Sequence, residues 1–247
     1  MNRYTLARWA LLLAFFLSFQ ALAAGKHTHF SLLEEPRKPF PKKFVVLPLD
    51  VEVMIMSAGG VIEKTESYTQ QARGNFDKAL QTHLSKSKKF QTVALPALTA
   101  DERTEIDDYL AVYDVVAGQA FRLAGVGAAW KHKAKHFDYT LGGGLKFIKE
   151  KTGADAAVVF IGRDVMSSAE RKAAVIFAAV LGVGLPLGSS YMTVGVVDLE
   201  TGDLLWTNQK HGLSDFIDAN AAQKMVDEVL GDYPGPIADN AVVAVNP

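Results

Sequence analysis

The sequence of 247 residues contains no cysteine. This absence excludes disulfide bonds, thiolate zinc sites and a cysteine nucleophile, and it excludes the lipid-modified cysteine that anchors bacterial lipoproteins. There is also no large excess of charge of one sign, because the chain has 26 basic and 27 acidic residues. Arg3 and Arg8 lie in an N-terminal segment that is expected to be removed, as described below. Without them the chain has 24 basic and 27 acidic residues, a formal charge of −3. This balance predicts that the protein does not bind nucleic acid.

The motifs of common catalytic sites are missing as well. The three glycines at 142–144 have neither the lysine nor the spacing of a phosphate-binding loop. No serine lies in a nucleophile-elbow pattern, and no nucleophile with an adjacent base is recognisable. We therefore predict a protein that is not an enzyme, with no catalytic residues and no cofactor.

The first 23 residues predict a cleavable signal peptide. Arg3 and Arg8 precede an apolar block over 9–19, and the small residues Ala21 and Ala23 follow with the spacing of a cleavage site. The block is short for a membrane span of about 20 residues, although a retained anchor helix is the alternative. The mature protein is thus expected in the periplasm, free or associated with the outer membrane, and not as a lipoprotein.

The remaining chain predicts one folded domain with extensions at both ends. Residues 24–43 are rich in proline and charge and predict an extended leader. Residues 44–231 predict a single α/β domain with an apolar insertion near 173–188, and residues 232–247 a C-terminal tail.

The hydrophobic pattern predicts the fold class of this domain. The β-forming residues over 44–56, which alternate from Leu49 onward, predict a strand in which Pro48 requires an edge position, a bulge or a break. The almost continuous apolar stretch over 154–164 is typical of a central strand that is covered on both faces. Helical spacing over 66–85 and 216–230 predicts helices. Together these elements predict a mixed β-sheet with helices packed against it, ending in a β-hairpin and a C-terminal helix.

Four residues of the hairpin predicted over 194–206 have clear structural roles. Asp198 can accept hydrogen bonds from turn amides, and Thr201 and Gly202 supply the geometry of a short turn. Trp206 brings a large surface for burial and an indole N–H for a partner. These residues explain a well-formed hairpin without any chemistry.

Three segments carry a resemblance to a known family. FVVLPLD (44–50), GADAAVVFIGRD (153–164) and YMTVGVVDLETGDLLWTNQ (191–209) resemble the envelope proteins related to the curli-secretion channel protein and to the amino-terminal domain of TolB. The resemblance covers about 43–230 and is most specific in the hairpin. It implies a TolB-like α/β sandwich that works by assembly in secretion or polysaccharide export, and no catalytic residues. Many such relatives carry the lipidated cysteine that this chain lacks.

The run from Ala173 to Val197 contains no charged residue. Its glycines, together with Pro186, would interrupt a transmembrane helix, and its second half alternates like a strand. Two interpretations stay open. The first half is either a buried connection before a core strand or an apolar loop that projects toward a membrane or a partner; in the second case the contact residues are Val180, Leu181, Val183, Leu185 and Leu187.

One histidine pair is a weak candidate for metal binding. His132 and His136 are four residues apart, which places them on one face if the segment is helical. Three neighbouring lysines would repel a cation, and Asp138 is the one nearby carboxylate that could complete a site. We therefore predict no metal site here.

Two polar clusters have simpler explanations. Asp50 and Glu52 share one face of a predicted strand, which favours the solvated side of a sheet over a catalytic carboxylate pair. Trp130 with the basic residues of 131–136 could rest on anionic lipid headgroups, but the cluster is at the small end for such a signal. A solvated loop is the favoured interpretation.

The sequence thus favours a non-enzymatic periplasmic or outer-membrane-associated protein that acts by subunit assembly in envelope secretion or export. Its expected partners are envelope protein subunits, including further copies of itself. A peripheral contact with a membrane is expected in addition. The alternative is a periplasmic module that binds a small ligand or a metal near His132 and His136.

Overall fold

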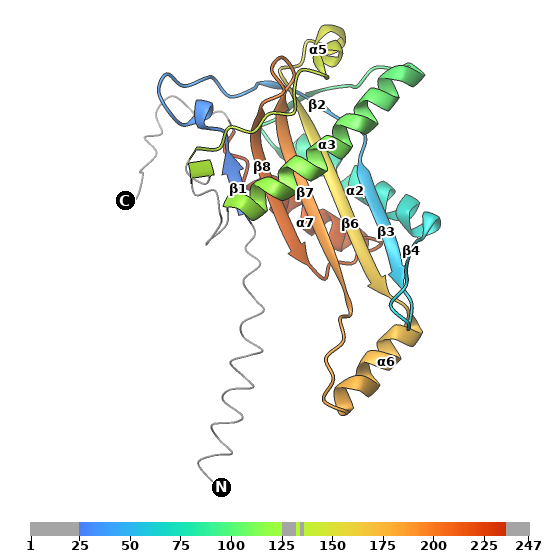
Figure 1. Cartoon of the computed structure of the whole chain (residues 1–247). Coiled ribbons are helices and arrows are strands. Elements are labelled where there is room, and N and C mark those ends of the chain that lie inside the picture. Colours follow the sequence, from blue (N-terminus) through green and yellow to red (C-terminus); the bar gives the residue numbers. More distant parts are fainter. Residues whose placement is uncertain (1–24, 125–131, 134–135, 236–247) are drawn as a thin grey trace.

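The computed structural model describes residues 25–124, 132–133 and 136–235. The predicted signal peptide and the end of the predicted tail lie outside these residues, as does Trp130. The described chain forms a mixed sheet with helices on both faces (Figure 1). The strands are β1 Gly25–Thr28, β2 Lys43–Val46, β3 Asp50–Met56, β4 Ile62–Lys64, β5 Gln91–Val93, β6 Ala156–Ser167, β7 Gly188–Asp198 and β8 Leu204–Gly212. The helices are η1 Phe30–Leu32, α2 Glu66–Lys86, α3 Ala100–Ala124, α5 Lys146–Thr152, α6 Ala169–Val180 and α7 Ala219–Gly231.

Strand β6 is the centre of the sheet. The order is β1-β8-β7-β6-β2-β5, and β3 pairs with β6 beyond the end of β2, with β4 outside it. β2 and β3 both run parallel to β6, whereas β7 and β8 are antiparallel to their neighbours. Pro48 lies in the break between β2 and β3, where a residue without a backbone N–H does not interrupt the ladder. The prediction of a mixed-sheet α/β fold is confirmed.

Helices cover the two faces of the sheet and create two hydrophobic cores. α2 and α7 pack over one face, where Phe76, Phe160 and Trp206 are buried. α3 and α5 lie over the other face, where Tyr113 and Ile148 are buried. Because both faces of β6 are covered, its side chains from Ala156 to Ile161 are all buried, as its uninterrupted apolar sequence predicts.

The β7–β8 hairpin is closed by a tight, well-bonded turn. The Asp198 carboxylate accepts hydrogen bonds from the backbone N–H groups of Glu200, at 2.7 Å, and Thr201, at 3.0 Å. Gly202 has a φ of +76°, and its N–H donates to the Asp198 carbonyl at 2.9 Å. Trp206 is fully buried on β8.

Three expected segments differ from the structure. The predicted leader contains the edge strand β1, which pairs with β8, and the short helix η1; this pairing joins residues about 180 positions apart, so local pattern does not reveal it. The charged composition of residues 167–172 suggests a break after β6, but these residues contain the start of α6, because Ser168 caps the helix. The helix predicted over 216–230 is α7 over Ala219–Gly231, which begins later because Asp218 caps it and which includes Gly231.

Candidate functional site

The most distinctive feature of the surface is a projection from one end of the sheet. It consists of α6 and the return segment 181–187, and we call these residues, 169–187, the apolar arm. The arm connects the end of β6 to the start of β7 and extends beyond the sheet and its covering helices (Figure 1).

Local capping explains why the arm is a helix followed by a sharp reversal. The Ser168 hydroxyl accepts a hydrogen bond from the Arg171 N–H at 3.1 Å, which begins the helix. At the other end Gly182 has a φ of +77°, and its N–H donates to the Ala179 carbonyl at 3.0 Å while the next N–H, of Val183, donates to the Ala178 carbonyl at 2.8 Å. This pair of hydrogen bonds is a Schellman motif. Glycine is favoured at this position because it has no Cβ and therefore adopts the left-handed conformation without a steric penalty.

The arm is rooted in the body of the protein by a buried arginine. The Arg171 side chain donates to the carbonyl of Ala58 at 3.3 Å and to the carbonyl of Pro186 at 3.2 Å, while its Nε has no hydrogen-bond partner. Ser167 donates to the Leu187 carbonyl at 2.6 Å. Arg171 therefore ties together α6, the β3–β4 turn and the return segment, so the arm leaves the sheet at a fixed place.

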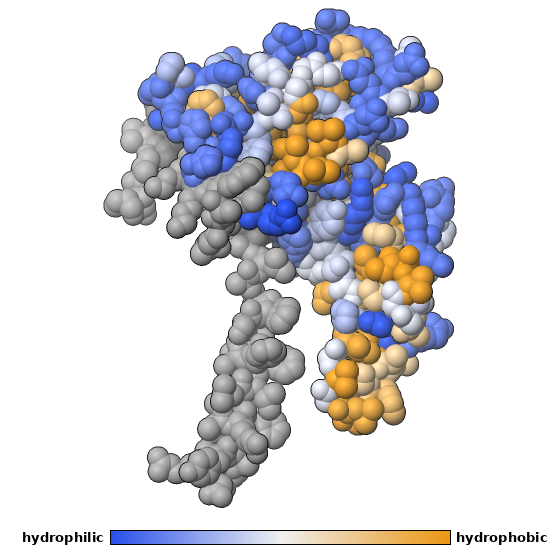
Figure 2. Space-filling view, in the orientation of Figure 1, coloured by the Kyte–Doolittle hydropathy of each residue, from blue (hydrophilic) through white to orange (hydrophobic). Residues whose placement is uncertain are grey.

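Beyond this root the arm exposes hydrophobic side chains. Six of the twelve large hydrophobic residues exposed in the described part of the chain belong to it, with 48–80% of each accessible: Ile176, Phe177, Val180, Leu181, Val183 and Leu187. Figure 2 shows the projection largely in the hydrophobic colour. Val61, Ile62 and Leu213, on the β3–β4 connection, β4 and the segment after β8, are also exposed.

The structure therefore shows the first half of the uncharged run as a projection and not as a buried connection. Of the contact residues expected from the sequence, Val180, Leu181, Val183 and Leu187 are exposed and Leu185 is half-buried. Sequence reasoning missed Ile176 and Phe177, because the run was not recognised as helical. The signals were present: Ser168 as a helix cap, Glu170 in the first turn and the glycine at 182 as the stop.

Within the described residues, no helix combines the length and apolar character needed to cross a membrane.

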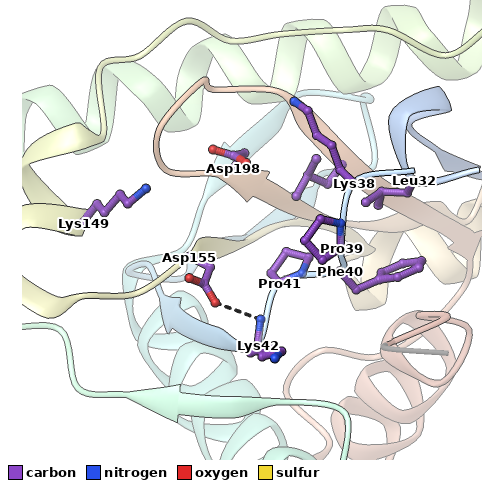
Figure 3. Close-up of a pocket in the computed structure, with 10 residues that line it drawn as sticks. Leu32, Lys38, Pro39, Phe40, Pro41, Lys42, Lys149, Asp155 and Asp198 are labelled. Atoms are coloured by element: carbon purple, nitrogen blue, oxygen red, sulfur yellow. Dashed lines mark hydrogen bonds between the residues drawn. The ribbon is translucent and has the colours of Figure 1, made fainter. Parts of the chain in front are cut away.

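A second candidate is a cavity of about 380 Å³ beside the leader, shown in Figure 3. Its two carboxylates already hold backbone groups: Asp155 accepts from the N–H groups of Lys42 and Lys43, each at 2.9 Å, and Asp198 accepts from the turn. Burial alone would raise the pKa of Asp155, but these two backbone donors bring its pKa below the usual value. The carboxylates thus fix the chain path and do not form an acid–base pair.

The histidine pair is not completed into a metal site. His132 and His136 lie one turn apart, since the His136 N–H donates to the His132 carbonyl at 2.9 Å. His136 stacks on Phe30 with ring centroids 4.0 Å apart, and its Nδ1 lies 3.7 Å from a carboxylate oxygen of Glu34. No group of three histidine, aspartate or glutamate side chains suited to a metal occurs among the described residues.

Asp50 and Glu52 form an ionic network with basic neighbours. Arg163, on the adjacent strand β6, donates to the Asp50 carboxylate at 2.7 Å, and its Nε lies 3.7 Å from Glu52. Lys64 on β4 donates to Glu52 at 2.7 Å, which lowers the pKa of that carboxyl. These charges neutralise one another across three strands, so the pair stabilises the sheet edge and has no free base.

One buried carboxylate lies close to the root of the arm. Asp164, 3% exposed, accepts a hydrogen bond from the Phe216 N–H at 3.0 Å and borders a small cavity with Lys172 and Leu213. Burial raises the pKa of Asp164 to about 6, and Asp215 nearby adds to the rise. At neutral pH the folded protein therefore holds Asp164 mostly as a buried carboxylate, and the burial of this charge lowers the stability of the fold.

We expect Asp164→Asn to stabilise the protein at neutral pH. Since the folded pKa lies above the unfolded one, the wild-type side chain contributes stability below pH 4, and this contribution is lost as the pH rises through about 6. The amide oxygen can still accept the Phe216 N–H. The gain should reach as much as about 3 kcal/mol at pH 7.5 and vanish near pH 4, measured by urea denaturation at several pH values. An equal difference at every pH would contradict this cause.

Comparisons with known proteins add little. No family model matches the chain, and no curated protein does. Among solved structures, a single-substitution variant of the PelC dodecamer from Paraburkholderia phytofirmans is 11% identical, with 84% of this chain and 96% of that chain covered and a TM-score of 0.32. A second PelC dodecamer structure from the same organism is 10% identical, with 84% of this chain and 94% of that chain covered and a TM-score of 0.31. A hypothetical protein from Chlamydia trachomatis is 9% identical, with 70% of this chain and 72% of that chain covered and a TM-score of 0.25. Similarity at this level carries no argument about function.

Proposed function

We propose that the chain is a non-enzymatic protein of the cell envelope that acts by attachment to another surface through its apolar arm. The single observation that carries this proposal is the exposure of six large hydrophobic side chains on an element that is rooted in the sheet but packs on little else. Contiguous apolar surface of this kind on a folded protein marks interaction sites, because leaving it in water is unfavourable.

The polar clusters support a role without catalysis. Asp155 and Asp198 hold backbone amides, and Asp50, Glu52 and Arg163 neutralise one another. A catalytic site needs a nucleophile or base that is free to reach a substrate. The charged groups considered above have structural tasks instead, and this favours a binding protein.

The leader pattern supports a place outside the cytoplasm. Residues 1–23 have the composition of a cleavable signal peptide, and a chain without cysteine cannot receive the usual lipid anchor. We propose a periplasmic protein that associates with the outer membrane and works with envelope subunits, further copies of itself included, in secretion or export. An apolar arm offers one substitute for the missing anchor.

Replacement of the arm tests this function. A variant in which a short glycine-serine turn replaces residues 173–185 keeps Arg171 and the Pro186 carbonyl that it contacts. We expect the wild-type protein to be recovered from cell extracts with membranes or in large complexes, and the variant to be recovered as a free monomer. Fractionation followed by size-exclusion chromatography measures both.

The matched control for this experiment is Val112→Gln with Val115→Gln. These exposed side chains lie on α3, away from the arm (Figure 1), and glutamine is a good helix former. The control should fractionate like the wild type. A wild-type protein that is itself free and monomeric, or an arm variant that still pellets, would overturn the proposed function.

A further inference from the structure

The surface that the arm contacts is a separate question, and here we infer that it is the interfacial region of a phospholipid bilayer. This inference rests on the proposed function and names the partner of the same site. Four properties of the arm support it: its symmetry, its area, its length and its charge.

Beyond its charged first turn, the helix of the arm, residues 173–180, is apolar around its whole circumference. Ile176, Phe177 and Val180 are exposed, and so is Ala179, while Ala174 and Val175 are half-exposed. A helix that docks in a protein groove needs one apolar face and keeps a polar face toward water. A helix that is apolar on all sides is desolvated fully only in a medium that surrounds it, and a bilayer is such a medium.

The exposed apolar area of the arm is close to that of a single-chain lipid anchor. Six side chains with 48–80% exposure present roughly 200–450 Å² of apolar surface. A standard protein–protein interface takes about 800 Å² of total surface from each partner, of which about 450 Å² is apolar, so the arm lies at or below the apolar part of such an interface. The area of the arm equals about 7–15 methylene groups at about 30 Å² each, which approaches the single acyl chain that gives weak, reversible membrane binding.

The length of the arm sets how deeply it can enter. Residues 173–180 form about 12 Å of helix at 1.5 Å per residue, against a hydrocarbon core of about 30 Å. The return segment 181–187 is neither helix nor strand, and irregular backbone is not tolerated deep in lipid. The arm therefore reaches the boundary between headgroups and acyl chains and does not cross it.

Charges at the root of the arm are of both signs. Glu170, Arg171 and Lys172 begin α6, and Glu63 and Lys64 lie on β4. No charged residue follows until Asp198. With basic and acidic groups nearly balanced at the headgroup level, attraction to anionic lipid is small, and burial of apolar surface supplies the affinity. Binding should then depend little on salt or on anionic lipid content.

The absence of cysteine allows a clean test of this inference. In Ala179→Cys the exposed end of α6 receives a single environment-sensitive fluorophore, and Ala111→Cys places the same label on the exposed surface of α3. Both proteins are expressed as the full chain and used in the form that the cell produces. They are titrated with vesicles of phosphatidylcholine, with and without phosphatidylglycerol, at low salt and in 1 M NaCl.

We expect the fluorescence of the label at 179 to shift to the blue and rise several-fold, and that of the label at 111 to stay unchanged. The titration curves should be similar at low salt and in 1 M NaCl, and with and without phosphatidylglycerol. Adding Phe177→Gln and Val180→Gln to the first protein should raise the lipid concentration for half-binding at least about tenfold. The matched pair Val112→Gln and Val115→Gln should leave it unchanged.

The other outcomes separate this inference from the function on which it rests. If the label at 179 responds to protein concentration and not to vesicles, the arm contacts a second copy; the lipid inference is then wrong and the proposed function stands. If binding disappears in 1 M NaCl, charge and not the arm drives it, and the inference is wrong. If neither vesicles nor protein concentration changes the signal, and arm replacement leaves fractionation unaltered, both proposals fail.

Discussion

Replacing Trp206 with alanine is expected to lower the free energy of unfolding by about 3–5 kcal/mol. The side chain is 0% exposed, and its ring lies 5.3 Å from the ring of Tyr233 in an edge-to-face arrangement. Tyr233 in turn contacts Phe44 and Phe90, so the indole completes an aromatic cluster between β8 and the segment after α7. Removing it leaves a cavity that this packed cluster cannot close.

Urea denaturation followed by far-UV circular dichroism measures the effect. Trp206→Phe is the matched control, because it keeps a ring against Tyr233 and should cost clearly less than the alanine variant. A folded domain has about 5–15 kcal/mol of stability, so the alanine variant should be partly unfolded at physiological temperature. A loss below about 1 kcal/mol would show that the cluster does not support the hairpin.

The second large effect is expected at the hairpin turn, for Gly202→Ala. The residue has a φ of +76°, and an added Cβ would lie 1.9 Å from the carbonyl oxygen of Gly142. The Leu141 N–H donates to the Gly202 carbonyl at 2.8 Å, and Tyr109 donates to the Gly142 carbonyl at 3.1 Å. The clash forces these segments apart, and we expect a loss of about 3 kcal/mol or more.

Gly60→Ala separates the clash from the backbone strain. Gly60 has a similar φ, +86°, but nothing lies within 4 Å of the added Cβ. It should cost about 1–2 kcal/mol, the strain of the left-handed conformation alone. Equal losses for the two variants, measured by urea denaturation under the same conditions, would contradict the contact between the turn and Gly142.

Much of the fold could be predicted from the sequence, because its signals are local. The stretch 154–164 is apolar without interruption and forms the covered centre of the sheet. Pro48 has no N–H to donate, so it could be assigned to a break between two strands. The spacing over 66–85 depends on helical periodicity and matches α2 closely.

The remaining features depend on interactions that composition does not encode. β1 pairs with β8 across most of the chain, and a short polar segment gives no local sign of such a partner. The uncharged run has the same composition whether it is core or projection, so the exposure of Ile176 and Phe177 needed coordinates. The partners of Asp50 and Glu52 on β6 and β4 likewise follow from register.

The place where the arm joins the sheet has a mechanical consequence. The arm continues from the end of β6 and returns into β7. These two strands pair along 11 residues of β6, from Ala156 to Met166. β6 is also hydrogen-bonded to β3, and β7 to β8. Because these bonds run across the strands, a pull on the arm along the strand axis loads whole ladders in shear at once. A force applied at the tip of the arm is therefore carried by the central strands of the sheet, so the arm can transmit force to the whole domain.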